Sequence, residues 1–201
     1  MNFDFSEEQK ALQSEVQRFL ADRSDLSVAR AVLDDASMSH AEAVWREMLD
    51  LGWAGIAIPE QYGGVGLGYL ELCVMAQELG RSLAPVPFSS TVYQFCEAVL
   101  RGGNEEQRCA VLAGVAAGET IGTLAFAEGM GFPAPDRIKL RCEQGRLHGE
   151  KWPVADAMIA DAAVVLAVNE SNEPCLCLVN LAQDGVCLLY TSDAADDPTL
   201  V

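Results

Sequence analysis

The chain has 201 residues, of which 50% are hydrophobic, and its 30 acidic and 13 basic side chains give a formal charge of −17. This length suits one large or two modest domains with a sizeable core, and so acidic a surface excludes nucleic acid and anionic membrane surfaces as partners. The N-terminal MNFDFSEEQK lacks the apolar stretch of a signal peptide, and no uncharged apolar run reaches about 18 residues, so we expect a soluble, cytoplasmic protein.

The first 118 residues show helical periodicity and repeated helix-start signals. Ser6 and Gln9 form a capping box, and apolar residues follow it at helical spacing. Two further capping boxes, SHAE at 39–42 and NEEQ at 104–107, predict two more helix starts. Gly52 is placed to end the helix that the first of these opens. We therefore expect five helices. The first starts at Ser6, and the others cover 39 to Gly52, 68–79 with an end at Gly80, 90–101, and 104 to Gly118.

The pattern changes to short strands after residue 118. Residues 137–143 alternate basic and apolar side chains, which is typical of a half-buried strand. The chain then turns and returns through 147–154, and three further apolar runs follow at 161–168, 175–181 and 186–190. Helices first and strands second favour an α+β protein rather than alternating βαβ units. We predict an all-α helical domain at 1–118 and a small antiparallel β-barrel or sandwich domain at 119–190.

The last residues depart from the strand pattern. From about residue 188 the sequence becomes small and acidic, and we assign 191–201 to a tail outside the natural sequence of the protein. It resembles the translated read-through of a sequencing adapter, which would truncate a longer protein. The alternative is a natural, frayed C-terminus.

The seven cysteines give no sign of a metal site at the level of sequence. They are scattered, no CxxC motif occurs, and the single C-x-C pair, Cys175 and Cys177, lies on one face of a predicted strand. The two histidines, His40 and His148, have no neighbours of ligand type. We therefore expect reduced core cysteines and no metal.

Several motifs occur together in an order that carries a family resemblance. They are LGWAGIAIPEQYGGVGLGYLELCVMAQELGR at 51–81, APVPF at 84–88, NEEQR at 104–108, AAGETIGTLAFAE at 116–128 and LHGEKWPVADAMIADAAVVLA at 147–167. Over residues 1–187 the chain resembles the acyl-CoA dehydrogenase family in its N-terminal helical and middle β-domains. The resemblance implies FAD as cofactor, an acyl-CoA substrate, an electron-transfer acceptor protein and a homo- or hetero-oligomer. It also implies a C-terminal helical domain that this chain lacks.

The glycine-rich segment at 51–72 allows two interpretations. Pro59 fixes one backbone torsion, while Gly63, Gly64, Gly66 and Gly68 allow left-handed or close-packed backbone. In one interpretation the low bulk leaves space for an acyl chain or part of a flavin. In the other the segment is a tight structural connector that touches no ligand.

The resemblance places the flavin-facing positions in two strands. In 124–128 these are Leu124, Phe126 and Ala127, and Ala127 replaces the family's usual threonine. The main chain at 126 and 127 would still bind the pyrimidine edge, because backbone groups do not depend on side-chain identity. In 151–155 the corresponding positions are Pro153 and Ala155, where the family has an aromatic residue and a threonine, and Trp152 is displaced by one.

Two further features concern possible contacts with the phosphates of a cofactor. The turn GMGFPAPDR at 129–137 departs from the family's glycine- and serine-bearing pattern, which puts its phosphate contacts in doubt. Arg137, Lys139 and Arg141 form a basic stripe on the predicted strand. The stripe either faces a pyrophosphate or is a solvated strand face.

The catalytic base is unknown from this sequence. The resemblance implies a glutamate from the C-terminal domain that takes the α-proton of the thioester. Three functions stay open: a fragment of a flavin-dependent acyl-CoA dehydrogenase that makes 2,3-enoyl-CoA, a non-catalytic partner subunit of a heteromeric dehydrogenase, or a helical interaction module without a cofactor. The carboxylates at hand, none of which matches the base position, are Glu60, Glu71, Glu78, Glu119 and Glu128.

Overall fold

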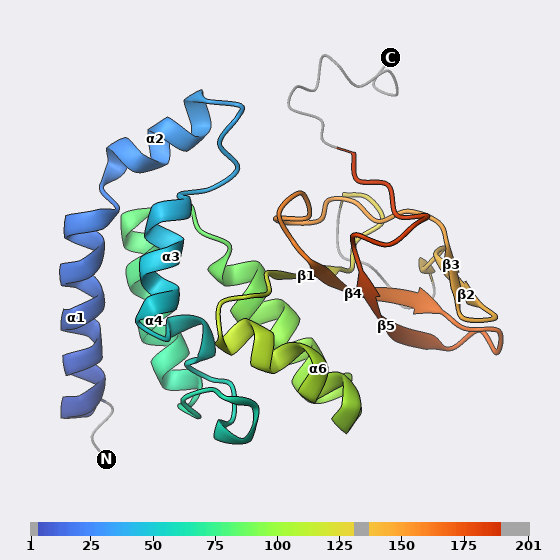
Figure 1. The fold of residues 1–201 in the computed structure, drawn as a ribbon, viewed down its shortest axis with the longest axis horizontal. Helices are drawn as coiled ribbons and strands as arrows, with labels where there is room; N and C mark the ends of the chain where they lie inside the picture. The colour runs from blue at the N-terminus through green and yellow to red at the C-terminus, as the bar shows by residue number, and fades with distance from the viewer. Residues whose placement is uncertain (1–3, 131–136, 190–201) are drawn as a thin grey trace.

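The computed structural model describes residues 4–130 and 137–189. Helices fill the first part of the chain and a small sheet the second, and the two lie side by side (Figure 1). The helical elements are α1 (Glu7–Arg23), α2 (Leu26–Asp34), α3 (Glu42–Asp50), α4 (Tyr69–Ser82), α5 (Glu97–Gly102) and α6 (Glu105–Ala116), with the 3₁₀ turns η1 (Trp53–Gly55) and η2 (Glu60–Tyr62) and the π-helix η3 (Ser89–Cys96).

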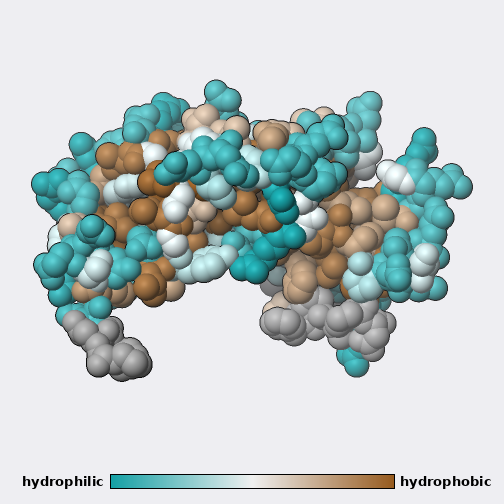
Figure 2. Space-filling model, turned by 90° about the horizontal axis from the view of Figure 1, so that it is seen from below, coloured by the Kyte–Doolittle hydropathy of each residue, from teal (hydrophilic) through white to brown (hydrophobic). Residues whose placement is uncertain are grey.

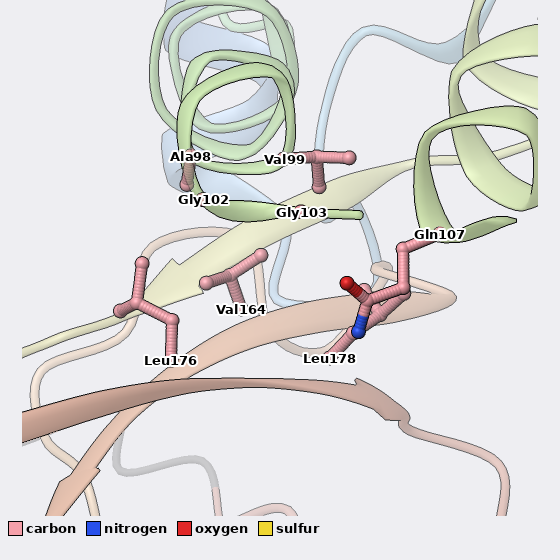
Figure 3. A pocket seen from close by; sticks show the side chains of 8 residues that line it. All are labelled: Ala98, Val99, Gly102, Gly103, Gln107, Val164, Leu176 and Leu178. Carbon is pink, nitrogen blue, oxygen red and sulfur yellow. The ribbon is translucent and has the colours of Figure 1, made fainter. Parts of the chain in front are cut away.

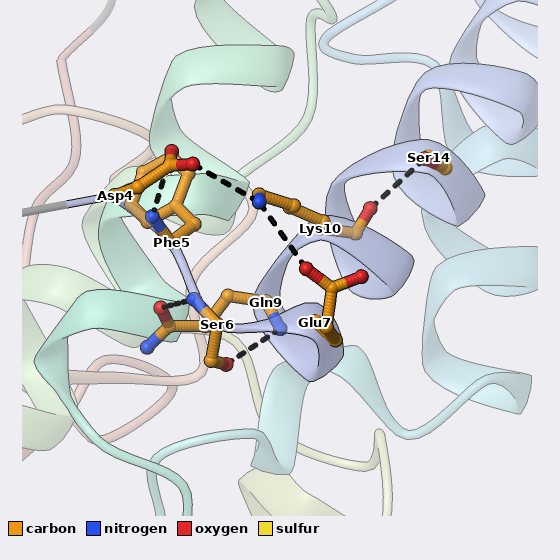
Figure 4. A network of polar contacts seen from close by, with 7 residues as sticks. All are labelled: Asp4, Phe5, Ser6, Glu7, Gln9, Lys10 and Ser14. Atoms are coloured by element: carbon orange, nitrogen blue, oxygen red, sulfur yellow. Dashed lines mark hydrogen bonds and ion pairs between the residues drawn. The ribbon is translucent and has the colours of Figure 1, made fainter. Parts of the chain in front are cut away.

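Two of the three predicted capping boxes are confirmed. Ser6 Oγ accepts a hydrogen bond from Gln9 N at 3.2 Å, and Gln9 Oε1 accepts one from Ser6 N at 2.9 Å (Figure 4). Asn104 and Gln107 make the same reciprocal pair at the start of α6. Each box satisfies two backbone donors that the first helical turn leaves without partners.

Two predicted helix boundaries are wrong, and one is confirmed. The box at 39–42 does not form: α3 begins after Ala41, whose N–H donates to Pro85 O at 2.8 Å, so tertiary contact sets this boundary. The helix predicted to end at Gly80 continues to Ser82, and Leu83 takes the left-handed conformation with φ 51°. Gly52 does terminate α3, in the left-handed conformation with φ 73°.

The sheet is mixed, which corrects the prediction of an antiparallel barrel. Its strands are β1 (Gly122–Ala125), β2 (Arg141–Glu143), β3 (Arg146–His148), β4 (Ala162–Val168) and β5 (Pro174–Asn180). β1 and β2 both pair with β4 in parallel, whereas β2–β3 and β4–β5 are antiparallel. The long connection between β1 and β4 permits the parallel pairing, because it lets the chain re-enter the sheet in its original direction. Strand alternation alone carries no information on this direction.

Several of the expected strands are shorter than predicted or do not form. The return through 147–154 is a strand only at Arg146–His148, the strand expected at 124–128 ends at Ala125, and 151–155 forms only an isolated bridge at Trp152. In 137–143 only Arg141–Glu143 is a strand, because the N–H groups of Lys139 and Leu140 donate to the Glu128 carboxylate instead of a neighbouring strand. Residues 186–189 form no strand, and residue 190 lies outside the described part of the chain. The predicted tail at 191–201 also lies outside it.

Alternate residues of β4 and β5 face two different apolar layers. Ala162 and Val164 pack with the helices in the main core, whereas Ala163, Val165 and Ala167 belong to a second cluster on the other face. Apolar side chains accordingly gather in both halves of the molecule on the face shown in Figure 2. The sheet therefore joins the helices through one face and builds a smaller core on the other.

The junction between helices and sheet is tightly packed. Phe95 of η3 lies so close to Gly122 that an added Cβ would approach its ring to 2.1 Å, so this strand position requires glycine. Elsewhere at this junction is a mostly apolar cavity of about 20 Å³, which has room for no more than a water molecule. Its lining comes from α5, α6, β4 and β5: Ala98, Val99, Gly102, Gly103, Gln107, Val164, Leu176 and Leu178 (Figure 3).

Within residues 4–130 and 137–189 no helix combines the length and the apolar character that a membrane span needs.

Candidate functional site

The two segments predicted to face a flavin lie side by side. Trp152 N donates to Ala127 O at 2.9 Å, and Gly129 N donates to Trp152 O at 2.8 Å, which makes an isolated parallel bridge between Glu128 and Trp152. The two stretches are 25 residues apart in the sequence at this bridge, counted from residue 127 to residue 152. The fold thus brings together the residues that sequence reasoning had grouped.

A largely buried ion pair holds this junction. Lys151 Nζ lies 2.6 Å from Glu128 Oε1, and the two side chains are 5% and 12% exposed. The same carboxylate accepts hydrogen bonds from Lys139 N at 2.7 Å and Leu140 N at 2.9 Å. Burial raises the pKa of Glu128, but the bonds from Lys151 and the two amides outweigh burial, and the net pKa is below its usual value. Glu128 therefore stays ionised and links its own segment to Lys151 and to the loop at 139–140.

The π-helix η3 fixes the same junction from the helical side. Ser90 Oγ donates to Asp156 Oδ2 at 2.5 Å, and Thr91 Oγ1 donates to Gly122 O at 3.1 Å. Thr123 Oγ1 in turn donates to Ala155 O at 2.6 Å. Ser90, Thr91 and Thr123 are buried, so these bonds form in a low dielectric where an unpaired partner would be costly. The position of 151–156 thus depends on the helices as well as on the sheet.

The five predicted cofactor contacts divide into an inner and an outer group. Leu124 in β1 packs on the main core, and the half-buried Phe126 accepts a hydrogen bond from Lys151 Nζ at 3.4 Å. Ala127 is half-buried and presents backbone at the bridge, whereas Pro153 and Ala155 are exposed. Trp152, which is 51% exposed and lies beside Gly129, adds to the exposed apolar surface of Pro153 and Ala155. This apolar surface lies next to the backbone polar groups of the bridge. A flat, partly polar ring would fit such a surface.

The sequence of the chain matches a known protein family. A profile of the acyl-CoA dehydrogenase N-terminal domain matches residues 6–119, more than half of the chain. The chain belongs to the acyl-CoA dehydrogenase family. It is 32% identical over 169 residues to the mitochondrial isovaleryl-CoA dehydrogenase of Pongo abelii, a match that covers 81% of this chain and 40% of that protein. The chain therefore spans about two fifths of the length of this curated relative.

Solved structures agree with this assignment. One chain of the ChsE4-ChsE5 complex from Mycobacterium tuberculosis superimposes with a TM-score of 0.83 at 27% identity, covering 95% of this chain and 52% of that one. An acyl-CoA dehydrogenase from Bacillus anthracis, solved in complex with FAD, matches with a TM-score of 0.78 at 23% identity, covering 90% and 32%. The second likeness supports the fold alone.

The glycine-rich segment at 51–72 is tightly packed on itself. Val65, Gly66 and Leu67 donate backbone hydrogen bonds of 2.8–2.9 Å to Gly55, Ile58 and Ile56. A Cβ on Gly64 would lie 2.1 Å from the Ile58 carbonyl oxygen, so close backbone approach explains this glycine. Of the two interpretations of the segment, these contacts favour the structural connector.

The basic stripe does not form as predicted. Arg137 and Lys139 are exposed and lie outside the strand. Arg141 is in β2, where its Nη1 donates to Asn172 Oδ1 at 2.8 Å and its Nε lies 3.4 Å from Glu143 Oε1. The guanidinium is therefore already engaged by its neighbours on the sheet.

The candidate carboxylates divide into engaged and exposed groups. Glu78 is fully buried, Glu128 is paired with Lys151, and Glu71 accepts from Gln9 Nε2 at 2.9 Å and from Gly68 N at 3.0 Å. Glu60 and Glu119 are exposed. The engaged carboxylates hold protein groups, a structural role that leaves little capacity to abstract a substrate proton.

Sequence reasoning missed the residues that position the site. Lys151, Ser90 and Asp156 make its key polar contacts, although none stood out in the sequence. Ser90 and Thr91 did carry a weak signal, because three consecutive hydroxyl residues, Ser89 to Thr91, stand at the start of a predicted helix whose inner side chains are apolar. A larger hollow of about 650 Å³ between α1 and α3 is lined mostly by charged residues, including Arg18, Arg23 and Glu47, and lies apart from this site.

Proposed function

We propose that this chain is the N-terminal and middle part of a flavin-dependent acyl-CoA dehydrogenase that oxidises an acyl-CoA thioester to its 2,3-enoyl form. Family membership supports the reaction class. The observation that carries the proposal is the bridge between 127–129 and Trp152, which sets backbone polar groups beside exposed apolar surface. Bound FAD would accept the hydride that leaves the β-carbon. The acyl-CoA, the electron acceptor protein and the oligomer are proposed on the same basis.

The residues present fit a flavin through backbone more than through side chains. Ala127 N–H donates to no acceptor within the described residues, so it can donate to a carbonyl oxygen of the ring. Ala127, Pro153 and Ala155 supply no hydroxyl, and Pro153 has no N–H to donate. The surface beside Trp152 and Pro153 would exclude water from one side of the ring. We therefore expect FAD to bind through main-chain contacts and apolar packing.

The chain's own residues would orient the cofactor and leave the proton transfer to a group from elsewhere. Glu128 and Lys151 hold the two flavin-facing segments in register. We expect the base to come from the C-terminal domain that the family resemblance implies; the carboxylates of Glu78 and Glu128 are already engaged by protein groups. A cytoplasmic location stays a prediction, and several curated relatives are mitochondrial by name.

A flavin-release experiment tests this proposal. The longer gene product should purify yellow and release about one FAD per chain on denaturation. Lys151→Met should lower FAD affinity at least about tenfold, because the segments lose their buried tie. Lys139→Met is the matched control, since it removes the same charge from an exposed side chain in the neighbouring segment and should leave affinity unchanged. Protein that takes up no flavin under any condition contradicts the proposal.

A second function is favoured by the substitutions at the flavin-facing positions. Ala127, Pro153 and Ala155 remove the side-chain contacts that the family provides, and the structural relative ChsE4-ChsE5 is a complex of two different chains. A non-catalytic subunit of a heteromeric dehydrogenase would show these features. Flavin uptake and activity that require co-expression with a neighbouring paralogue would support this function over the first.

A further inference from the structure

Three cysteine thiols from two strands gather on the outer face of the sheet. Cys142 lies in β2, and Cys175 and Cys177 lie two residues apart in β5. Their sulphur atoms are all within 4.8 Å of one another, and each residue is half-buried as a free thiol. Cys142 is 33 residues from Cys175 along the chain, so the sequence pattern alone showed only the C-x-C pair. The parallel contact of β2 with β4 brings the third thiol into place.

The spacing of these sulphurs suits direct coordination of one metal ion. Cysteine sulphur binds zinc at about 2.3 Å, so three sulphurs around one ion lie roughly 4 Å apart. The thiols already lie on that scale, and small side-chain rotations would complete the arrangement. The group includes no histidine or carboxylate from the described residues. Its surroundings are apolar, formed by Leu147, Val165, Ala167 and Val179 of the second core.

We propose that Cys142, Cys175 and Cys177 form a three-sulphur site for a soft, thiophilic metal ion, with Cu⁺ as the best fit. Thiolates select soft ions such as Cu⁺ over hard ones. Zn²⁺ also takes sulphur, but its structural sites use four protein ligands, and this group offers three. Half-burial leaves a route for the ion to enter from solvent while the apolar wall shields the bound ion.

The apolar surroundings of the thiols also bear on the choice of ion, because the described residues add no carboxylate oxygen to the group. Hard ions such as Mg²⁺ and Ca²⁺ prefer oxygen and gain little here. The same site would link β2 to β5 and so stabilise the outer layer of the sheet.

A competition titration tests the site on the whole chain. The reduced protein is titrated anaerobically with Cu⁺ in the presence of a coloured Cu⁺ chelator, and we expect one tightly held Cu⁺ per chain. Cys142→Ser, Cys175→Ser and Cys177→Ser should each weaken binding at least about tenfold. The double variant Cys73→Ser/Cys109→Ser is the matched control, because it removes two exposed thiols and should retain wild-type affinity. Zn²⁺ in a parallel titration should bind more weakly.

X-ray absorption and thermal unfolding test the same metal site independently of the titration. X-ray absorption of the loaded protein should show three sulphur neighbours at about 2.3 Å, and Cu⁺ should raise the Tm of the wild type but not of Cys142→Ser. If a serine variant does not fold by circular dichroism, Cys142→Ala replaces it, since β2 is a short strand. Unchanged affinity in Cys142→Ser, or loss of binding in the Cys73/Cys109 variant, overturns the proposal. So does the absence of any tight Cu⁺ binding.

Discussion

Two glutamates, one fully buried and the other largely buried, show how differently the two halves of this molecule are held together. Glu78 on α4 is fully buried, and its carboxylate accepts from Gln13 at 3.0 Å, Gln17 at 2.9 Å and Arg81 at 2.7 Å. Glu128 beside β1 is held by Lys151 and by two backbone amides. Both carboxylates are ionised and have hydrogen-bond partners. The partners of Glu78 are side chains, whereas two of the three partners of Glu128 are backbone amides.

The difference lies in what supplies the partners. Gln13 and Gln17 are four residues apart and lie on one face of α1, so a helix turn places both against α4. Gln9, one turn earlier, donates to Glu71 in the same way. The amides that hold Glu128 come from 139 and 140, a loop whose path depends on the sheet. Side chains on one face of helix α1 thus hold Glu78, whereas backbone amides of a loop hold Glu128.

The largest expected effect is at the helical carboxylate. Glu78→Ala should lower the free energy of unfolding by about 3 kcal/mol, because it leaves two glutamine amides and Arg81 without their buried acceptor. Urea denaturation measures the loss. Glu15→Ala is the control, since it breaks an exposed pair with Arg18 and should cost less than about 0.5 kcal/mol. Equal losses in the two variants would show that Glu78 has no special role in joining α1 to α4.

At the junction we expect a smaller but more local effect. Glu128→Ala should cost about 2 kcal/mol, because it removes the partner of a lysine that is 5% exposed and the acceptor of two amides. Hydrogen exchange should show faster exchange at Lys139 and Leu140, while amides of α1 and α4 stay protected. Glu128→Gln keeps one acceptor and should recover part of the loss. Protection at 139 and 140 that survives in Glu128→Ala contradicts the assignment.

The helical half was easier to predict from the sequence than the sheet half, because helix ends depend on local residues and the junction at the sheet does not. The caps at Ser6 and Asn104 and the turn at Gly52 depend on neighbouring residues, and the predictions there are confirmed. The helix α2, none of whose residues is buried, was not predicted. The box at 39–42 failed because a long-range bond to Pro85 sets the helix start. In the sheet half, the adjacency of 127 and 152 came from family resemblance. The parallel pairing and the role of Lys151 depend on contacts that no local pattern encodes.

Acid should weaken both carboxylate sites in the same direction. Burial raises the pKa of each glutamate, but the hydrogen bonds outweigh burial and the folded-state pKa is lowered. The unfolded chain therefore binds more protons, so the stabilisation is complete above the ordinary glutamate pKa of about 4.3 and is lost as pH falls below it. Denaturation at several pH values should give a shallower acid slope in Glu78→Gln and in Glu128→Gln. Asp25 and Asp35, whose pKa values serine hydrogen bonds lower, leave a residual slope.

The smallest effect tests how the helices position the candidate site. Ser90→Ala removes the 2.5 Å bond to Asp156 and should cost about 1 kcal/mol. Ser89→Ala is the matched control, because the neighbouring serine is exposed and its loss should fall within error. The more telling readout is local: hydrogen exchange within 151–156 should quicken in Ser90→Ala alone, while the amides of β4 and β5 stay protected. If both serine variants behave alike, η3 does not hold this loop, and the sheet by itself sets the geometry around Trp152.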